Sequence, residues 1–394
     1  MRKLIAALLF PLACSTACGT GSLTRPGGRV ENPSHIFAEV DATIERAIAE
    51  KKIPGGVYHF EQNGQVYEKA YGNRALVPNV EPMTIDTMFD AASLTKVVAT
   101  TPSVWLLIER GKIALDDPAQ KFIPEFPHAG ITIRHLLTHT SGLRPDLDNT
   151  NPWIGYDTAM RLILQEEPVN KPGYVFRYSD INFEILGEIV QRVSGKPLDE
   201  FAKSEVFQPL GMKDTTFRPT VNGQQPTRIA PTEPDEHGVM MRGTVHDPTA
   251  RRMGGVAGHA GLFTTAHDLA RYARMLLGGG APIFKPETVK MLTSVQSPPN
   301  VAVRRTGGFD YDSGFSRPRG ELYPIGSFGH TGFTGTILWI DPASKSFYVF
   351  LSNRVHPNGK GSVTQLQVAL GTLSARAAGY STPVVPRVDR KSVV

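Results

Sequence analysis

The sequence predicts an α+β protein in which strands near both ends of the chain enclose a mainly helical middle. Three observations support this fold class. Residues 56–71 alternate between apolar and polar in the manner of a β-hairpin. Residues 112–260 show mostly helical patterns connected by loops. Two further strand-like segments, 336–340 and 347–351, follow only after that helical middle.

Composition is that of an ordinary globular protein. The chain has 394 residues, of which 40% are hydrophobic and 20% charged, so it can form one large domain or two intertwined ones with a sizeable core. The formal net charge is +5, but the basic residues are scattered along the chain. Nucleic-acid binding requires a clustered basic patch or a known motif, and the sequence shows neither, so no nucleic-acid partner is predicted.

Residues 1–18 have the organisation of an export signal. Arg2 and Lys3 precede an apolar run over 4–12, and small residues follow that run. The run is too short to span a membrane as a helix. The sequence therefore predicts an exported protein of the periplasm or cell envelope.

Both cysteines of the chain, Cys14 and Cys18, fall in this signal. The segment resembles a bacterial lipoprotein signal, in which a cysteine carries the lipid that anchors the protein to a membrane. Residues around either cysteine fit that pattern loosely, so lipidation at Cys18, lipidation at Cys14, and plain cleavage with release all stay open. In each case the mature domain has no cysteine, which excludes an intrachain disulfide and thiol chemistry.

The folded domain is predicted at 34–378, after a linker at 19–33 that is rich in glycine, threonine and proline. Apolar residues recur every three or four positions over 34–52, which predicts a first helix with Ser34 as a candidate cap. The hairpin that follows should turn at Asn63-Gly64, because this dipeptide favours tight hairpin turns.

A second helix is predicted to begin in the stretch Phe89-Asp-Ala-Ala-Ser-Leu-Thr-Lys96. Ser93 and Lys96 are three positions apart, so on a helix their side chains lie on one face, one turn apart. The residues that follow are mostly apolar, which indicates a buried helix with Ser93 at its N-terminal end, where the helix dipole favours negative charge. Pro102 lies inside this helix and is expected to kink it.

The spacing of Ser93 and Lys96 predicts nucleophilic catalysis. A serine hydroxyl is a weak nucleophile at neutral pH and needs a nearby base or charge to help remove its proton. A lysine one turn away can supply that help if burial or a second cation lowers its pKa. The alternative is an ordinary helix start that contains both residue types by chance.

In the helical middle, His135 and His139 are four positions apart, a spacing that can place two zinc ligands on one helical face. No glutamate follows His135 and no third ligand is evident, so a packing or capping role is favoured. The sequence therefore predicts no metal and no cofactor.

Tyr178-Ser179-Asp180 lies at the junction between a loop and a strongly amphipathic helix that Gly195 closes. Such a junction places a phenol and a carboxylate at the rim of whatever the helix packs on. The alternative is that Tyr178 is a core aromatic residue and Asp180 a helix cap.

Residues 253–262 form a glycine-rich loop without the Gly-Lys-Ser/Thr of a phosphate loop and without the leading strand of a dinucleotide fold. They predict a close backbone crossing, followed by a helix at 267–277 that Thr265 or Thr264 caps. Later in the chain, His330-Thr331-Gly332 opens the late strands. A last helix is predicted over 363–377, and the tail at 379–394 is predicted to be disordered.

Three motifs in this order, Ser93-Leu-Thr-Lys96, Tyr178-Ser-Asp180 and His330-Thr-Gly332, resemble those of the penicillin-recognising serine hydrolases. The resemblance is to the branch that holds class C β-lactamases, D-alanyl-D-alanine carboxypeptidases and β-lactamase-like esterases. It covers about residues 35–378. Lesser signatures that agree are Leu136-Leu-Thr-His-Thr-Ser-Gly-Leu143, Ile185-Leu-Gly-Glu-Ile-Val-Gln-Arg-Val-Ser-Gly195 and Gly258-His-Ala-Gly-Leu-Phe-Thr-Thr265.

The resemblance implies a β-lactamase/transpeptidase-like fold. In it, an antiparallel sheet built from the first hairpin and the late strands carries the first and last helices. A mainly helical domain, here about 112–260, is inserted, and the active site lies at the junction. The roles implied are catalytic for Ser93, Lys96 and Tyr178, oxyanion-binding for the backbone amides of Ser93 and Phe333, and substrate-binding for Asp180, His330, Thr331 and Gly332.

The implied chemistry is an acyl-enzyme mechanism. Ser93 attacks a carbonyl group, Tyr178 is the implied general base, and Lys96 together with His330 is expected to lower the pKa of the Tyr178 phenol. Thr331 and the adjoining strand edge are expected to hold a carboxylate or amide of the substrate.

Two residues depart from the class C pattern. Asp180 stands where asparagine is usual, and an ionised aspartate accepts hydrogen bonds but cannot donate them to an acylamino β-lactam. His330 stands where lysine is usual, which exchanges a permanent charge for one expected to titrate near neutrality. Both changes argue against an efficient β-lactamase.

The sequence therefore predicts a serine hydrolase acting on a small amide or ester, foremost a D-alanyl-D-alanine carboxypeptidase acting on peptidoglycan peptides. The alternatives are a carboxylesterase of the same fold, then a class C-like β-lactamase, and then a non-catalytic binder of cell-wall peptides. An α/β-hydrolase is disfavoured because the chain has no Gly-x-Ser-x-Gly elbow. The oligomeric state is open.

Overall fold

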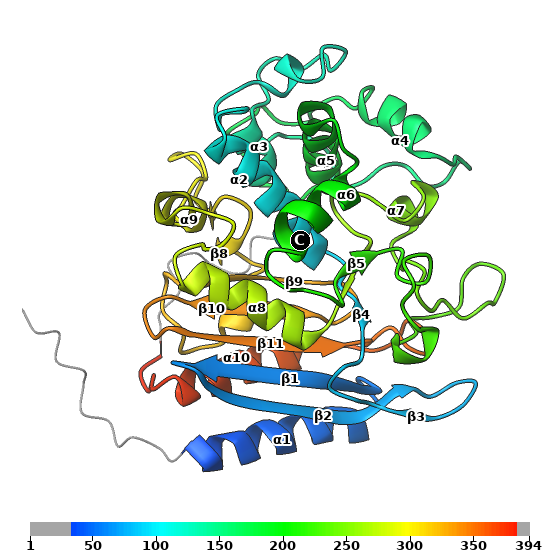
Figure 1. The fold of residues 1–394 in the computed structure, drawn as a ribbon, viewed down its shortest axis with the longest axis vertical. Coiled ribbons are helices and arrows are strands. Elements are labelled where there is room, and N and C mark those ends of the chain that lie inside the picture. The colour runs from blue at the N-terminus through cyan, green and yellow to red at the C-terminus, as the bar shows by residue number, and fades with distance from the viewer. Residues whose placement is uncertain (1–32, 384–394) are drawn as a thin grey trace, which may run out of the picture. The chain divides into compact units, whose positions relative to one another are not determined.

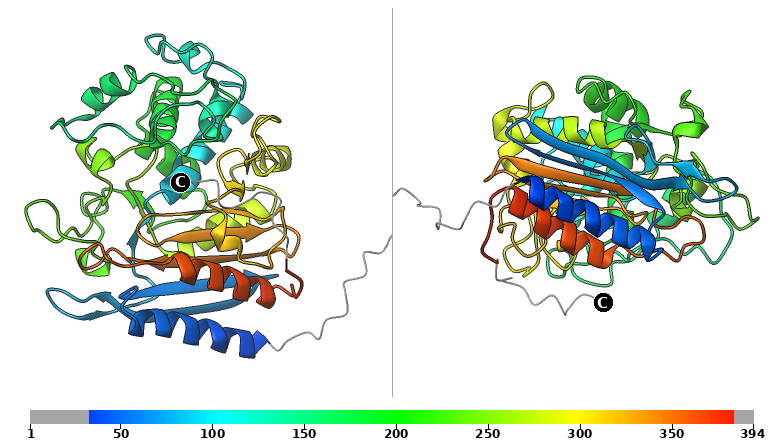
Figure 2. Two further views of the ribbon diagram at one scale, coloured as in Figure 1. Left: turned by 180° about the vertical axis from the view of Figure 1, so that it is seen from behind. Right: turned by 90° about the horizontal axis from the view of Figure 1, so that it is seen from below.

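The computed structural model describes residues 33–383, whose arrangement is drawn in Figures 1 and 2. The predicted export signal, its two cysteines, most of the linker and the tail beyond residue 383 lie outside the described residues. Among the helices of residues 33–383, none has the length and apolar character needed to cross a membrane.

The central element is an eight-stranded sheet with strand order β3-β2-β1-β11-β10-β9-β8-β7. Each paired neighbour runs antiparallel, and the early hairpin joins the late strands because β1 pairs with β11. The strands are β1 (Gly55–Gln62), β2 (Gln65–Ala75), β3 (Glu81–Pro82), β7 (Arg304–Arg305), β8 (Asp310–Asp312), β9 (Phe328–Thr331), β10 (Ile337–Asp341) and β11 (Ser346–Ser352).

The early hairpin turns where the sequence predicted. Asn63 and Gly64 both adopt the left-handed backbone conformation, with φ of 50° and 79°. A two-residue turn with two positive φ values matches the twist of the strands it connects, and asparagine followed by glycine tolerates those angles best. This turn fixes the register in which Gln62 faces Gln65.

The sheet is buried on both faces, as the alternation along β11 shows. Phe347, Val349 and Leu351 belong to one hydrophobic core, whereas Tyr348 and Phe350 belong to the other. The helices α1 (Pro33–Ala49) and α10 (Thr364–Ala377) lie side by side on the second face, and α8 (Ala266–Leu277) covers the first (Figures 1 and 2).

Helices dominate the segment between the hairpin and the late strands, as predicted (Figure 1). A small three-stranded sheet in the order β4-β6-β5 lies within this part, and its strand β4 precedes the turn that carries Ser93. Its strands are β4 (Phe89–Asp90), β5 (Thr216–Phe217) and β6 (Leu262–Thr264); the remaining α-helices are α2 (Thr101–Glu109), α3 (Ile133–Leu137), α4 (Tyr156–Ile163), α5 (Asp180–Ser194), α6 (Leu198–Ala202), α7 (Pro248–Arg252) and α9 (Pro286–Thr293).

Five short turns of 3-10 or π helix complete the described elements. The π turns are η1 (Lys96–Thr100) and η3 (Lys203–Phe207). The 3-10 turns are η2 (Ala119–Lys121), η4 (Pro226–Arg228) and η5 (Arg317–Arg319).

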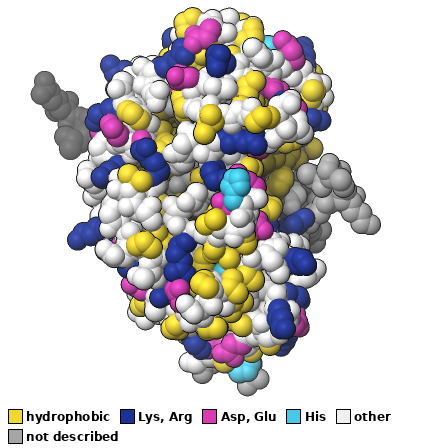
Figure 3. Space-filling view, turned by 90° about the vertical axis from the view of Figure 1, so that its right-hand side faces the viewer, with side chains coloured by type: hydrophobic (Ala, Val, Ile, Leu, Met, Phe, Trp, Pro, Cys, Tyr) yellow, Lys and Arg dark blue, Asp and Glu magenta, His cyan; other side chains and the backbone are white. Residues whose placement is uncertain are grey.

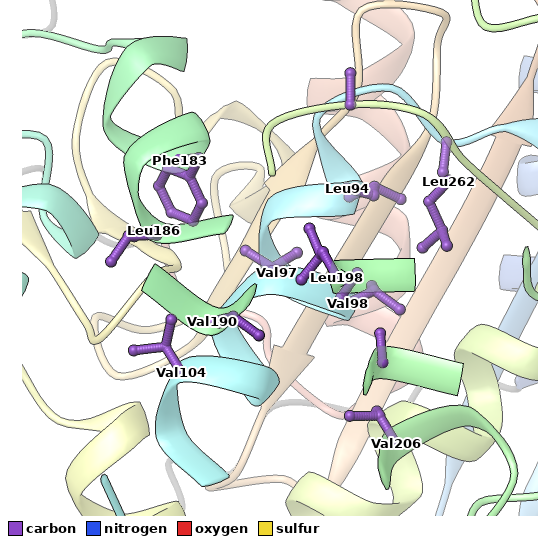
Figure 4. Packing of buried hydrophobic residues seen from close by; sticks show 14 of the residues in the cluster. Leu94, Val97, Val98, Val104, Phe183, Leu186, Val190, Leu198, Val206 and Leu262 are labelled. Carbon is purple, nitrogen blue, oxygen red and sulfur yellow. The ribbon is translucent and has the colours of Figure 1, made fainter. Parts of the chain in front are cut away.

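The helical segment that follows Ser93 is buried, as predicted. Leu94, Val97 and Val98 pack among apolar side chains of α5, α6, η3 and β6 (Figure 4). The helix is irregular near Pro102, which lies in the first turn of α2 directly after the π turn η1. A proline lacks the N–H that a regular helix interior requires, and the wider π turn accommodates this gap.

Several boundaries differ from those predicted. The first helix begins at Pro33, so Ser34 lies inside it rather than capping it. The helix α8 begins at Ala266, and the Thr265 side chain accepts a hydrogen bond from the Asp268 amide, which selects Thr265 over Thr264 as its cap. Strands of two or three residues, such as β3 and β8, were not predicted because they are too short to show a periodic pattern.

Charged side chains of both signs are interspersed on the face drawn in Figure 3. This mixture agrees with the scattered basic residues in the sequence and differs from the one-sign stripe typical of nucleic-acid-binding surfaces. That the chain has no nucleic-acid partner stays a prediction.

Candidate active site

Ser93 is displayed at a sharp turn between strand β4 and the buried helix. Ala92 has a φ of 47°, an unusual conformation for a residue other than glycine, and Asp90 holds it by accepting a hydrogen bond from the Ala92 amide at 2.9 Å. Ser93 is partly exposed, whereas the other residues of 91–100 are buried. The turn therefore presents the Ser93 hydroxyl to solvent from an otherwise closed segment.

The turn after β9 lies against this segment because residue 332 is glycine. A Cβ atom on Gly332 would lie 2.4 Å from the Ala91 carbonyl oxygen and 2.1 Å from the Thr336 hydroxyl. The Thr336 hydroxyl donates a hydrogen bond to the same Ala91 oxygen at 3.0 Å, and the Thr334 hydroxyl donates to the Asp90 carbonyl at 2.7 Å. These contacts bring His330, Thr331 and Gly332 to the edge of the site.

Lys96 is fully buried, and the structure gives its ammonium group three oxygen partners. Its Nζ lies 3.1 Å from the Ser93 hydroxyl, 3.1 Å from the His259 carbonyl and 2.6 Å from the Asp180 carboxylate. The first two are hydrogen bonds and the third is an ion pair, and together they hold the ammonium beside Ser93. The predicted contact between Ser93 and Lys96 is present.

Lys96 is an ammonium ion in this arrangement. Burial by itself lowers the pKa of Lys96, but the adjacent Asp180 carboxylate and the Tyr178 oxygen raise it above its ordinary value. The condition under which Lys96 could act as a neutral base, a lowered pKa, is therefore not met in the free protein. The physical reason is Asp180, because an anion at 2.6 Å outweighs the cost of removing the ammonium from water.

Tyr178 lies beside Lys96 and packs against two other rings. The Lys96 Nζ is 5.1 Å from the centroid of the Tyr178 ring. The ring centroids of His139 and Phe315 lie 4.5 and 5.0 Å from that of Tyr178. These contacts restrict the phenol to an orientation near Lys96 and Ser93.

The phenol of Tyr178 is neutral in the free protein. Burial raises its pKa, and the Asp180 carboxylate raises it further, whereas the Lys96 charge and hydrogen bonds from Ser93 and Lys96 oppose the rise without cancelling it. The expectation of a lowered pKa for Tyr178 is therefore wrong. A standing tyrosinate is not available, so any proton that Tyr178 accepts has to be matched by one that it gives away.

His139 packs beside Tyr178, in keeping with the packing role that the sequence favoured. It is buried, and its Nδ1 accepts hydrogen bonds from the Ser179 amide and the Asn182 side chain, each at 3.2 Å. His135, in contrast, completes a capping box with Thr132 at the start of α3. These contacts confirm packing and capping roles for the two histidines in place of zinc binding.

Asp180 begins α5 and directs its carboxylate to Lys96. Ser179 occupies the cap position, so the alternative that Asp180 is merely the helix cap is wrong. The Asp180 side chain is 21% exposed, which leaves it partly open to the site. Contact between Asp180 and a substrate stays a prediction.

His330 is buried rather than exposed to solvent. It is 2% exposed, its Nδ1 lies 2.7 Å from the Thr331 carbonyl, and its ring centroid is 6.0 Å from that of Tyr178. Burial, followed by the charges of Arg305 and Lys96, holds the pKa of His330 well below 6.5. The expectation that His330 titrates near neutrality is therefore wrong, and the ring carries no charge at pH 7.

This buried neutral histidine makes a testable contribution to stability. Because the folded-state pKa lies below the unfolded value of about 6.5, its contribution is complete above that pH and is lost as the pH falls. Relative to a His330→Asn variant, we expect the free energy of unfolding of the wild type to fall by about 1.4 kcal/mol per pH unit below pH 6.5. Urea denaturation at several pH values measures this difference, and a difference that does not change with pH would contradict it.

Two backbone amides near Ser93 have no acceptor within the described residues. Among the described residues 33–383, neither the Ser93 N–H nor the Phe333 N–H donates a hydrogen bond to the protein. The Phe333 side chain is 61% exposed at the rim, where the Arg354 guanidinium lies 4.3 Å from its ring centroid. The rim beside Ser93 therefore combines free amide donors with an exposed aromatic surface.

The glycine-rich loop packs closely, as predicted, and also brings in an unpredicted histidine. A Cβ atom on Gly258 would lie 1.8 Å from the Phe183 carbonyl oxygen, so the loop contacts α5 through backbone alone. The next residue, His259, holds Lys96 with its carbonyl, and its ring lies between Asp247 and Glu184 at 2.9 and 3.3 Å. The sequence signal for it was a histidine inside a glycine run.

The family to which the chain belongs follows from comparison with known proteins. A family model described as "Beta-lactamase" matches residues 40–373. The chain belongs to the β-lactamase family. The predicted β-lactamase/transpeptidase-like fold is thereby confirmed, and the chain is a serine hydrolase of the β-lactamase fold.

Relatives within and around the family carry several names. A protein of Salmonella agona (strain SL483) with the name "Putative D-alanyl-D-alanine carboxypeptidase" is 31% identical over 350 residues, covering 80% of each chain. EstCE1, a hydrolase with promiscuous acyltransferase activity, superposes with a TM-score of 0.70 at 22% identity, covering 87% of this chain and 99% of its own. A class C β-lactamase gives 0.67 at 19% identity, covering 89% and 99%. These two structures share the fold of this chain.

Proposed function

We propose that Ser93 is the nucleophile of this hydrolase and forms an acyl-enzyme with a small amide or ester. The observation that carries the proposal is the position of the Lys96 ammonium, 3.1 Å from the Ser93 hydroxyl and fixed by Asp180 and the His259 carbonyl. A fixed cation at this place stabilises negative charge as it develops on the serine oxygen. The N-terminus of the buried helix adds to the same effect.

Tyr178 acts in the proposal as a proton relay. It accepts the Ser93 proton as it gives its own phenolic proton to the leaving group, so no free tyrosinate is needed. The hydrogen bond from Ser93 and the neutral state of the phenol both support this exchange. Deacylation runs in reverse, with the attacking water in the place of the leaving group.

The free amides of Ser93 and Phe333 would bind the oxyanion of the tetrahedral intermediate. Both are backbone donors that need no reorganisation when the charge forms. Thr331, at the partly exposed end of β9, and Gly332 would then align the substrate along the strand edge.

As the substrate we propose a cell-wall peptide that ends in D-alanine. The support is the name of the Salmonella relatives, which cover most of this chain at 31% identity. Such a substrate fits the export predicted from residues 1–18, which, with lipid anchoring at Cys18 or Cys14, we retain as a proposal.

A carboxylic ester is the second candidate, and the state of His330 favours it. A peptide that ends in D-alanine carries a carboxylate, which a fixed cation at position 330 would recognise. His330 is buried and neutral, so it cannot supply that charge. An ester without a carboxylate needs no such cation, so a neutral His330 would not weaken its binding. An efficient β-lactamase stays disfavoured, because Asp180 pairs with Lys96 and offers no amide donor.

The intact mass of the purified mature protein, recorded after mixing with a reactive penicillin, tests the nucleophile directly. We expect one penicilloyl group on the wild-type protein and none on a Ser93→Ala variant. Release of D-alanine from a peptide ending in D-alanyl-D-alanine and the hydrolysis of an activated ester are measured in parallel. The mass of protein recovered from the cell envelope also reports the mature N-terminus and any lipid.

The outcomes separate the candidates. A long-lived adduct with D-alanine release supports the carboxypeptidase, whereas ester hydrolysis without an adduct supports the esterase. Rapid turnover of the penicillin would establish a β-lactamase and contradict our interpretation of Asp180. Activity that persists in Ser93→Ala would contradict the proposed nucleophile. Absence of activity in every assay would leave only a non-catalytic binder.

A further inference from the structure

Behind Lys96 lies a cluster of charged side chains that the acylation chemistry does not use. His259 is 1% exposed, and its two ring nitrogens face two different carboxylates. Its Nε2 lies 2.9 Å from Asp247, and its Nδ1 lies 3.3 Å from Glu184. The Asp180 carboxylate, which pairs with Lys96, also belongs to this cluster, so the cluster adjoins the candidate active site.

Three donor atoms converge at this place. One ligand atom each from Asp180, Asp247 and His259 lies within 4.8 Å of the other two. The side chains of the two aspartates are 21% and 25% exposed, while that of His259 is 1% exposed. An ion can therefore approach from the side of the two carboxylates and meet the imidazole at the inner end.

A second observation points to a ligand at the same place. Glu184 is 1% exposed, and neither of its carboxylate oxygens has a hydrogen-bond partner among the described residues 33–383. The Nδ1 of His259 lies 3.3 Å from one of these oxygens. A histidine that binds a metal with one ring nitrogen usually donates the other N–H to a carboxylate, and Glu184 is placed to receive it.

A metal ion at this place would replace a proton. Burial by itself lowers the pKa of His259, but Asp247, Asp180 and Glu184 raise it to about 9, so the ring is protonated in the free protein at pH 7. Binding of Zn²⁺ at Nε2 would therefore release one proton and add a single net positive charge beside the two aspartates.

We propose that Asp180, Asp247 and His259 form a binding site for a divalent transition-metal ion, with Zn²⁺ as the preferred occupant. One imidazole and two carboxylates with an open coordination position make a donor set that suits Zn²⁺. Hard ions such as Mg²⁺ and Ca²⁺ prefer oxygen ligands alone. The spacing of these three residues along the sequence does not predict the site, because they come from three separate segments.

Occupation of the site would inhibit the hydrolase. Asp180 cannot hold the Lys96 ammonium at 2.6 Å and a divalent ion at full strength together. Exchange of the His259 proton for the ion also adds positive charge beside that ammonium, which displaces Lys96 from Ser93. The binding site stands by itself, whereas this inhibition rests on the proposed function.

Calorimetric titration of the mature protein with ZnCl₂ tests the site, and Co²⁺ absorption reports the coordination of the ion. We expect one saturable Zn²⁺ site in the wild type and in Ser93→Ala, and at least about 100-fold weaker binding in His259→Gln. Asp247→Asn is the second variant, used if His259→Gln does not fold. His267→Gln is the matched control, because His267 also pairs with a carboxylate, Glu68 at 3.0 Å, yet belongs to no such group.

Absence of saturable binding up to about 1 mM Zn²⁺ would overturn the site. Equal weakening in His267→Gln and His259→Gln would overturn it as well. Ester hydrolysis that Zn²⁺ leaves unchanged in a protein that binds the ion would refute the inhibition. If the zinc-free protein hydrolyses nothing, the proposed function fails, and the calorimetric result still decides whether the site exists.

Discussion

Replacing Lys96 by methionine should lower kcat/KM for an activated ester by about 1,000-fold or more. Methionine has nearly the length of lysine but no charge, so the variant removes the ammonium that lies 3.1 Å from the Ser93 hydroxyl. It also leaves Asp180 without its partner at 2.6 Å, so we expect lower stability as well. Steady-state kinetics and chemical denaturation measure the two effects separately.

The double variant Lys96→Met with Asp180→Asn separates catalysis from folding. Removing both charges eliminates the unpaired carboxylate, so much of the lost stability should return, while the activity should stay low. A single Lys96→Met variant that keeps its activity within about tenfold of the wild type would contradict the proposed role of Lys96.

Replacing Gly258 by alanine should reduce the free energy of unfolding by about 3 kcal/mol. The added Cβ would lie 1.8 Å from the Phe183 carbonyl oxygen, and a backbone oxygen cannot move aside as a flexible side chain can. The loop would have to shift away from α5. That shift would move the adjoining His259 carbonyl, which holds Lys96, so kcat/KM should also fall.

Gly130→Ala is the matched control for this substitution. A Cβ atom on Gly130 has no neighbour within 4 Å, so this variant should unfold like the wild type. Chemical denaturation of both variants tests the expectation. If Gly258→Ala were as stable as Gly130→Ala, the close crossing of the glycine-rich loop and α5 would not constrain the fold.

The parts of the fold that could be predicted were those with a long periodic pattern or a specific turn. The hairpin around Asn63-Gly64, the helical middle and the late strands all follow from spacing alone. The pairing of β1 with β11 does not, because nothing local records which strands become neighbours; the family resemblance supplied it. Short strands such as β7 and the π turn η1 arise from tertiary packing and leave no trace in the pattern.

The residues of the site could be predicted from the sequence, but their protonation states could not. Ser93, Lys96 and Tyr178 do come together, with His330 close to Tyr178. The pKa shifts of Tyr178 and His330 were predicted wrongly, because they depend on burial and on neighbours from distant segments. Asp180 raises the pKa of Lys96, and burial keeps His330 neutral. The role of His259 beside Lys96 was missed for the same reason.

The pairing of the first strand with the last one determines how much of the chain has to be made before the active fold can form. Gly56 lies opposite Ser352, about 300 positions later, so the middle of the sheet closes only after residue 352 has been made. A growing chain that has reached α8 already contains Ser93, Lys96 and Tyr178, but it lacks the strand that supports the turn at Phe333. Such a high contact order makes folding slow and late. Hydrolytic competence therefore has to await the pairing of the late strands with the early hairpin.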